Sequence, residues 1–179
     1  IDELAARLER LATVGRARRA DDGGVADAER ADAMDRAHAY AFELLLDDSV
    51  RLVTLVGQAG TGKTLLALAA GLQKVVEEKA FARLLVSRPV FPLGRDIGFL
   101  PGAIEEKLRP WMQPVHDNLE LLLGIPGSDG KGGRSAEEFF DLGLVNIEPL
   151  TYIRGRSIPR QFILVDEAQN LTPHEVKTI

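Results

Sequence analysis

Residues 57–64 read Gly57-Gln58-Ala59-Gly60-Thr61-Gly62-Lys63-Thr64, and this stretch decides the fold. It matches the pattern G-x-x-x-x-G-K-[ST] at every position. The glycines let the backbone curl so that its N–H groups point at phosphate oxygens, and a following helix adds its positive N-terminus. Lys63 is expected to reach the β- and γ-phosphates of a nucleotide, and the Thr64 hydroxyl to bind Mg²⁺. The stretch therefore predicts a phosphate-binding loop.

A phosphate loop joins a strand to a helix, and the residues on either side of residues 57–64 predict these two elements. Before it, Leu52-Val53-Thr54-Leu55-Val56 is a short apolar run of the kind found in buried parallel strands. After it, residues 62–79 place apolar side chains at helical spacing. Further helices are expected over residues 25–46, 103–123 and 136–142, and further strands over 84–86, 144–147 and 162–165. This alternation predicts an α/β fold of the P-loop NTPase type, with a mostly parallel sheet and helices on both faces.

A pair of acids follows the last predicted strand, in the sequence Phe162-Ile163-Leu164-Val165-Asp166-Glu167. The carboxyl ends of parallel strands meet at one edge of the sheet, where ligands of α/β proteins bind. Asp166 is expected to hold Mg²⁺, and Glu167 to polarise an attacking water molecule. The alternative is that the two acids only cap a helix that starts near Leu171. Because the chain also has an intact phosphate loop, the catalytic interpretation is favoured.

Composition and charge exclude several other classes of protein. The chain has 179 residues, with 22 Lys and Arg against 27 Asp and Glu, and the surplus of acids lies within the first 50 residues. Bulk charge therefore gives no argument for nucleic-acid binding, which must rest on local arginines. The absence of cysteine excludes disulfides, thiolate zinc sites and a cysteine nucleophile, and it fits a cytoplasmic protein. There is no apolar run of about 18 residues, so no membrane span is expected.

Two other nucleotide-using classes stay open as alternatives. A small-molecule or nucleotide kinase is the first, because Tyr152-Ile153-Arg154-Gly155-Arg156-Ser157 resembles an arginine-rich lid. Such a kinase has little use for a water-polarising Glu167. A nucleotide-stabilised assembly scaffold with little turnover is the second. A GTPase switch is disfavoured, because no asparagine begins the base-reading sequence Asn-Lys-x-Asp.

Several further motifs follow the phosphate loop, namely Leu85-Val86-Ser87-Arg88-Pro89, Gly98-Phe99-Leu100-Pro101-Gly102, Glu106-Lys107 with Pro114, Tyr152-Ile153-Arg154-Gly155-Arg156, and Asp166-Glu167-Ala168-Gln169-Asn170. Together they resemble the PhoH family, phosphate-starvation-inducible ATPases related to superfamily 1 helicases, over about residues 41–179. The resemblance implies a helicase-like fold of the additional-strand, catalytic-glutamate type. It also implies Mg²⁺-dependent ATP hydrolysis coupled to RNA binding or unwinding, and assembly into a homo-oligomeric ring.

The resemblance also bears on how the chain is divided. Leu93-Gly94-Arg95-Asp96-Ile97 is closer to the long form of the family, which joins an N-terminal PIN ribonuclease domain to the ATPase. We therefore expect residues 1–48 to be a helical segment or linker after a PIN domain. Residues 49–179 are expected to be an ATPase domain whose last strands and sensor motif lie beyond Ile179. Where the family carries an Asn and a Gln that touch adenine, this sequence has Asp35 and His38.

Four arginines are expected to contact either RNA or the nucleotide of a neighbouring subunit. Arg88 and Arg95 belong to a Pro- and Gly-rich loop, residues 88–102, at a position where helicase-like proteins contact the nucleic-acid backbone. They are expected to bind the phosphates of single-stranded RNA, the alternative being a purely structural loop. Arg154 or Arg156 would reach the γ-phosphate of a neighbouring subunit in a ring, the alternative being an ion pair within one subunit.

Overall fold

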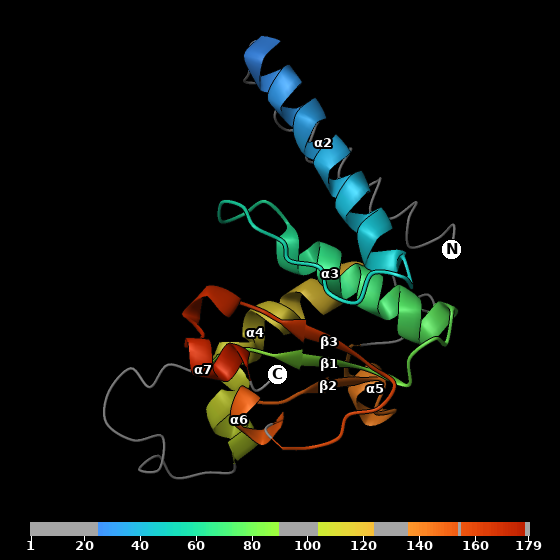
Figure 1. Cartoon of the computed structure of the whole chain (residues 1–179), viewed down its shortest axis with the longest axis vertical. Coiled ribbons are helices and arrows are strands. Elements are labelled where there is room, and N and C mark those ends of the chain that lie inside the picture. The colour runs from blue at the N-terminus through green and yellow to red at the C-terminus, as the bar shows by residue number, and fades with distance from the viewer. Residues whose placement is uncertain (1–24, 90–103, 124–135, 154, 178–179) are drawn as a thin grey trace, which may run out of the picture.

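The centre of the molecule is a parallel three-stranded sheet. The structure is a computed structural model and describes residues 25–89, 104–123, 136–153 and 155–177 (Figure 1). The strands β1 (Arg83–Ser87), β2 (Val145–Ile147) and β3 (Gln161–Val165) lie in the order β2-β1-β3. Leu84 of β1 lies opposite Val145 on one side and Phe162 on the other. Parallel neighbours require crossover connections, so the predicted α/β arrangement is confirmed.

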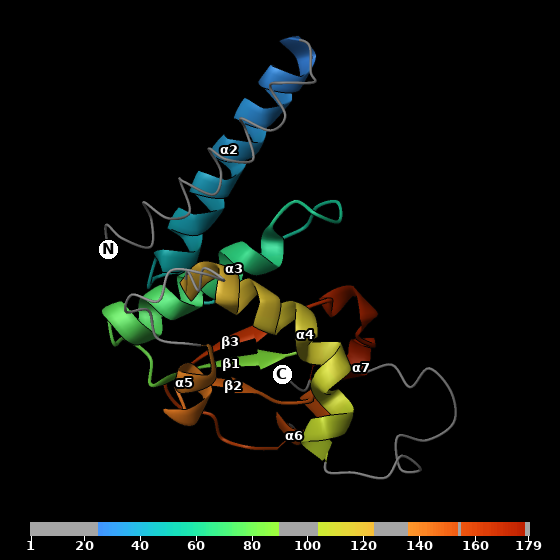
Figure 2. The same ribbon diagram turned by 180° about the vertical axis from the view of Figure 1, so that it is seen from behind.

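The hydrophobic core lies between one face of this sheet and three helices, α3 (Lys63–Leu72), α4 (Ile104–Leu123) and α5 (Ala136–Asp141). Seen from behind, α4 crosses this face (Figure 2). The core consists of Leu68, Ala69, Leu72, Val75, Leu84, Val86, Val115, Leu119, Leu122, Ala136, Phe139 and Val145. Because side chains alternate along a strand, Leu85 and Ile163 belong to the opposite face. Helical cover of that second face stays a prediction.

A glycine brings α3 unusually close to the sheet. A Cβ atom added to Gly71 would come within 2.7 Å of Leu84 Cδ1 and 3.2 Å of Phe162 Cδ1. Only a residue without a side chain allows this approach at the present spacing. The contact sets the distance between α3 and the two strands, and with it the position of the phosphate loop that precedes α3.

The helix predicted over residues 62–79 is present but changes type along its length. The α-helix α3 ends at Leu72 and continues as a short π-helix, η1 (Gln73–Glu77). Here the side chain of Lys74 is only 4% exposed, and its Nζ lies 2.8 Å from both Asp48 Oδ1 and Glu78 Oε2. Burial lowers the pKa of Lys74, but these two carboxylates outweigh it and hold the pKa above the ordinary 10.5. The ion pair joins the chain just after α2 to the body.

The predicted helix over residues 25–46 is confirmed as α2 (Val25–Leu46). It packs against α3 at one end and projects away from the body in both views (Figures 1 and 2). Among the described residues, no helix is both long and apolar enough to cross a membrane.

The strand predicted over Leu52–Val56 is wrong for this structure. The segment has no strand conformation, and Leu52 and Val56 are 84% and 91% exposed. Its composition suits a buried strand, but a strand also needs a neighbour that satisfies its backbone N–H and C=O groups. In the described sheet β1 pairs with β2 and β3, and no ladder includes this segment. The chain between α2 and α3 instead stands out as a loop (Figure 1).

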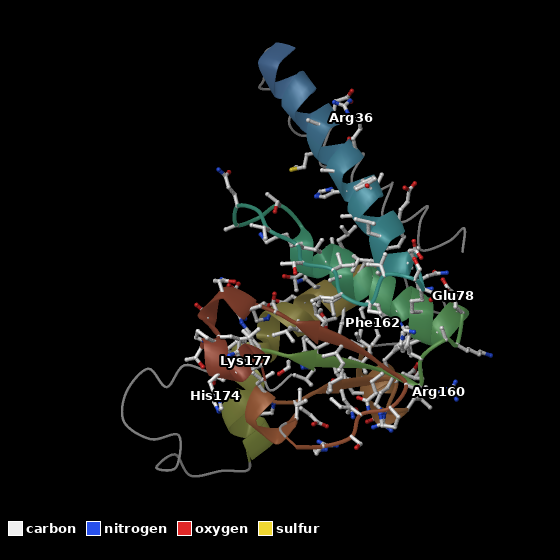
Figure 3. The ribbon with its side chains drawn as sticks, viewed as in Figure 1. Arg36, Glu78, Arg160, Phe162, His174 and Lys177 are labelled. Atoms are coloured by element: carbon white, nitrogen blue, oxygen red, sulfur yellow. The ribbon has the colours of Figure 1, made fainter. Side chains whose placement is uncertain are left out.

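Short helices follow the carboxyl ends of β2 and β3. Helix α6 (Leu150–Ile153) follows β2, while the 3-10 helix η3 (Ala168–Asn170) and helix α7 (Pro173–Val176) follow β3. Thr172 and Glu175 form a reciprocal capping box at the start of α7, as the sequence predicts for a helix here. His174 and Lys177 lie at this carboxyl end of the strands, and Arg160 lies at the opposite end (Figure 3).

Candidate nucleotide-binding site

The phosphate loop enters α3 through glycines in the left-handed region. Gly60 has a φ of 76° and Gly62 a φ of 83°, values that glycine adopts at no steric cost. Gly62 occupies the cap position of α3 and offers no side chain to the first turn. Helix geometry gives the N–H groups of Lys63 and Thr64 no carbonyl within the helix, and such groups are donors to phosphate oxygens.

The ammonium group of Lys63 folds back over the loop. Its Nζ donates to Gly57 O at 2.9 Å and to Gln58 O at 2.7 Å, and Thr61 Oγ1 lies 3.4 Å away. Thr61 Oγ1 in turn donates to Gln58 O at 2.9 Å. The positive charge therefore lies inside the curl of the loop, where an anionic phosphate would replace the carbonyls as its partner.

A histidine from α2 braces the same loop. His38 Nε2 donates to Thr61 O at 2.6 Å, and since a carbonyl only accepts, the proton must be on Nε2. The family resemblance associates His38 with adenine. The structure instead shows it on the backbone of the phosphate loop, with Asp35 about one turn earlier on the same helix. Helix α2 therefore contacts the candidate site directly.

The phosphate loop and the end of β3 meet at Thr64 and Asp166. Thr64 Oγ1 donates to Asp166 Oδ1 at 2.9 Å. The position of Asp166 is set by the sheet, because its N–H continues the parallel ladder and donates to Ser87 O at 2.9 Å. The two residues that the sequence assigns to Mg²⁺ are therefore neighbours, as required for one metal to contact both.

The oxygen atoms of this pair fit a small, hard cation. Mg²⁺ binds oxygen ligands octahedrally at about 2.1 Å, so adjacent ligands lie about 3 Å apart. The 2.9 Å separation of Thr64 Oγ1 and Asp166 Oδ1 agrees with that spacing. Within the described residues, no group of three or more His, Cys, Asp or Glu side chains gathers to hold a metal. A metal here would thus rely on the phosphates of a nucleotide and on water for its other ligands.

The carboxylate of Glu167 is held by a residue whose role the sequence did not predict. Gln169 Nε2 donates to Glu167 Oε2 at 2.5 Å. Glu167 itself has a φ of 54°, a left-handed conformation that is uncommon for a residue with a side chain. This conformation lets the chain turn from β3 into η3. The signal available in the sequence was the spacing of the two residues, since a side chain two positions away in a tight turn can reach back.

Arg88 lies over both acids rather than away from them. Its Nε is 3.9 Å from Asp166 Oδ2, and its Nη2 is 3.5 Å from Glu167 Oε1. Arg88 directly follows β1 as Asp166 directly follows β3, so the parallel register brings the side chains together. Binding of RNA phosphates by Arg88 stays a prediction.

Of the other predicted arginines, the structure describes only Arg156. Arg156 pairs with Glu148 within the same chain, with 2.6 Å between Nη1 and Oε2. This is the ion pair that the sequence offered as the alternative to an arginine finger. Arg95 and Arg154 lie outside the described residues.

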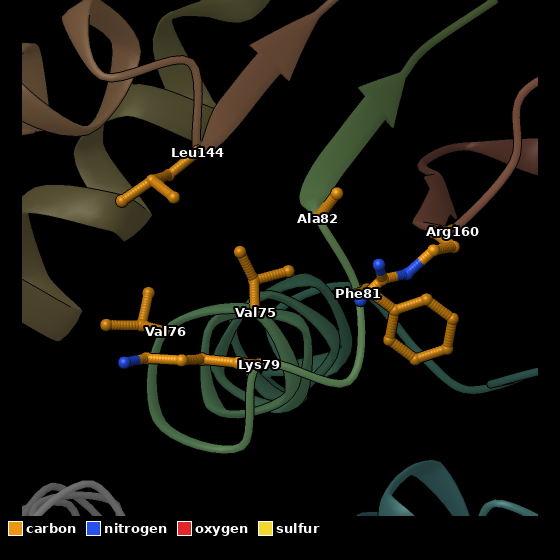
Figure 4. A pocket seen from close by; sticks show the side chains of 7 residues that line it. All are labelled: Val75, Val76, Lys79, Phe81, Ala82, Leu144 and Arg160. Carbon is orange, nitrogen blue, oxygen red and sulfur yellow. The ribbon is translucent and has the colours of Figure 1, made fainter.

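A separate pocket lies at the opposite end of the sheet. It has a volume of about 360 Å³ and is lined by Val75, Val76, Lys79, Phe81, Ala82, Leu144 and Arg160 (Figure 4). These residues surround the start of β1, whereas the phosphate loop and Asp166 lie near the carboxyl ends of the strands. The pocket is therefore not part of the candidate site.

Comparison with known proteins places the chain among PhoH-like sequences. A family model described as PhoH-like protein matches residues 34–179. Protein PhoH2 of Bacillus subtilis (strain 168) is 57% identical over 139 residues, which are 78% of this chain and 30% of that protein. Protein PhoH2 of Mycolicibacterium smegmatis is 44% identical over 140 residues, again 78% of this chain and 30% of that protein.

A shorter relative matches as well. The PhoH-like protein of Bacillus subtilis (strain 168) is 35% identical over 126 residues, which are 70% of this chain and 37% of that protein. The chain thus spans about a third of the length of the curated relatives that it matches. Because the family model covers most of the chain, the chain belongs to the PhoH family, a family of P-loop ATPases.

Proposed function

We propose that this chain binds Mg²⁺-ATP at residues 57–64 and hydrolyses it. The observation that carries the proposal is the 2.9 Å hydrogen bond between Thr64 Oγ1 and Asp166 Oδ1, which joins the phosphate loop to the acid after β3. Lys63 would stabilise the β- and γ-phosphates, and Glu167 would take a proton from the attacking water. Mg²⁺, when bound to Thr64 and Asp166, would neutralise charge on the phosphates.

A second part of the proposal concerns RNA and the assembly of the full-length protein. We propose that ATP turnover is coupled to the binding or unwinding of single-stranded RNA by the full-length protein, acting in the cytoplasm as a homo-oligomeric ring with a PIN domain in the same chain. What supports it is the family resemblance and the place of Arg88, at the carboxyl edge of the sheet where the Pro- and Gly-rich loop begins. Most of that loop, and Arg95 with it, lies outside the described residues.

One experiment separates the proposal from its alternatives. ATP turnover by the full-length protein is measured with and without single-stranded RNA, alongside transfer of labelled phosphate to small molecules. We expect turnover that RNA stimulates. Phosphate transfer to a small molecule would favour a kinase instead, and tight binding with negligible turnover would favour an assembly scaffold.

A further inference from the structure

Arg88 lies beside the two acids of the candidate catalytic centre. It follows β1 directly, and Ser87 is the last residue of the β1–β3 register, opposite Val165. The hydrogen bond from Asp166 N to Ser87 O extends this ladder one residue further, to the acids themselves. The side chain of Arg88 is 22% exposed, beside Asp166 at 14%. Its place between the acids is thus a consequence of the sheet.

The four carboxylate oxygens of the two acids all have partners. Asp166 Oδ1 accepts from Thr64 Oγ1, and Glu167 Oε2 accepts from Gln169 Nε2. The remaining oxygens, Asp166 Oδ2 and Glu167 Oε1, both face the guanidinium of Arg88 at 3.9 and 3.5 Å. Each carboxylate oxygen has two lone pairs, and the side chain of Glu167 is 40% exposed, so these contacts hold the two carboxylates in place without closing them to water.

The positive charge of Arg88 would repel a metal ion bound at Asp166. A divalent cation bound to Thr64 and Asp166 would lie within a few ångströms of the guanidinium, and like charges at that distance repel strongly in a partly buried site. Arg88 and Mg²⁺ therefore compete for the negative charge of Asp166.

We propose that Arg88 is a positioning residue that restrains the side chains of Asp166 and Glu167 and opposes the binding of Mg²⁺ at Asp166. This inference rests on the proposed ATP hydrolysis. An arriving phosphate group releases the restraint, because a guanidinium binds phosphate bidentately and leaves the carboxylates for it. The phosphate belongs either to the bound nucleotide or to the backbone of RNA.

The test compares Arg88→Ala and Arg88→Lys in the full-length protein. Arg88→Ala removes the restraint, so we expect RNA-independent kcat to rise severalfold. We also expect less Mg²⁺ to be needed for half-maximal turnover. Arg88→Lys retains a charge near Asp166 but cannot span both acids, so kcat should rise while the Mg²⁺ requirement stays near that of the native protein. Arg83→Ala, the same charge change at the other end of β1, is the matched control.

Two results would overturn the proposal. A lower kcat would show that Arg88 stabilises the transition state. Unchanged kinetics in Arg88→Ala would reduce the contact to a structural ion pair. Adding RNA shows where the phosphate comes from. If RNA supplies the phosphate, RNA accelerates turnover by the native protein but not by Arg88→Ala. If ATP supplies the phosphate, RNA changes the turnover of the two proteins equally.

A second measurement keeps this inference separate from the proposed hydrolysis. Binding of Mn²⁺ with a non-hydrolysable ATP analogue is followed by electron paramagnetic resonance, which requires no turnover. We expect Arg88→Ala to bind Mn²⁺ severalfold more tightly than the native protein and Arg83→Ala to match the native protein. Equal Mn²⁺ affinity in all three would overturn the competition at Asp166 even if ATP is hydrolysed. Absence of turnover with tighter Mn²⁺ binding would refute hydrolysis alone.

Discussion

Thr64 Oγ1 donates a 2.9 Å hydrogen bond to Asp166 Oδ1 and so connects two residues that are 102 positions apart in the chain. One lies in the first turn of α3 and the other directly after β3. The close packing of Gly71 against Leu84 and Phe162 holds α3 at the distance that makes this bond. The candidate metal site is therefore a property of helix-to-sheet packing as much as of the two motifs.

The hydroxyl of Thr64 should be required for metal-dependent binding. We expect Thr64→Val, which keeps the shape but removes the oxygen, to weaken Mg²⁺-ATP binding by about 10- to 100-fold, the effect typical of losing a group that supports a metal site. Thr64→Ser keeps the oxygen and should bind nearly as the native protein does. Calorimetry with and without Mg²⁺ measures both, and equal affinities for the two variants would refute the role of the hydroxyl.

Lys63→Ala should weaken nucleotide binding while leaving the fold intact. The change removes the charge that faces the loop, and we expect affinity to fall by about 10- to 100-fold, the scale of a hydrogen bond to a charged group. Alanine is well tolerated at the start of a helix. Lys79→Gly, an equal loss of charge at the opposite end of the sheet, is the control, and glycine suits the φ of 54° there. Unchanged affinity in folded Lys63→Ala protein would contradict the assignment.

Glu167→Gln should separate binding from chemistry. The amide keeps the size of the side chain but cannot accept a proton from water, so we expect turnover to fall by about 10²-fold or more with ATP binding retained. Steady-state hydrolysis and nucleotide titration measure the two effects. The control is Glu120→Gln, on an exposed position of α4. If Glu167→Gln hydrolyses ATP at the native rate, the base is another group.

Gly71→Ala should destabilise the fold. The new Cβ would meet Leu84 Cδ1 at 2.7 Å, and overpacking of this kind costs about 1–3 kcal/mol, more than the gain in helix propensity of about 1 kcal/mol. Denaturant unfolding measures the loss. Leu84→Val removes the clashing methyl groups, so the double variant should be more stable than the sum of the two single changes predicts. Strict additivity would show that the glycine is not needed for the close approach.

Lys74 should make stability depend on alkaline pH. Its pKa is raised above 10.5 in the folded protein by Asp48 and Glu78, despite burial. The contribution is therefore fully present below the unfolded pKa of 10.5 and is lost as the pH rises through the folded value. Lys74→Met replaces the ammonium with an apolar group of similar size, so we expect this alkaline loss to disappear in unfolding experiments.

The partners of Lys74 provide the converse experiment. Substituting both Asp48→Asn and Glu78→Gln leaves a buried ammonium without compensation, and we expect a cost of about 3 kcal/mol or more near neutral pH. Lys74→Met should cost far less, because it leaves only two carboxylates that water can reach. Equal losses in the free energy of unfolding for the two sets of changes would show that burial of the Lys74 ammonium does not determine stability.

Much of the local structure could be predicted from the sequence, because it depends on neighbouring residues. The glycines at 60 and 62, with positive φ, and the helix that begins at Lys63 follow from the phosphate-loop pattern itself. The apolar runs before Ser87 and Asp166 predicted strands, and Thr172 and Glu175 cap the short helix α7 within four residues of one another. Periodicity and caps act over a few residues, so the order of residues carries them.

Tertiary structure alone decided which of these elements meet. The run Leu52–Val56 looks like the other strands, but pairing requires a neighbour with free backbone groups, and local composition does not contain that information. The parallel register of β1 and β3 places Arg88 beside Asp166 and Glu167, a contact that its sequence neighbours did not predict. Contacts between residues about 80 positions apart depend on sheet order and register. These in turn depend on how the whole core packs.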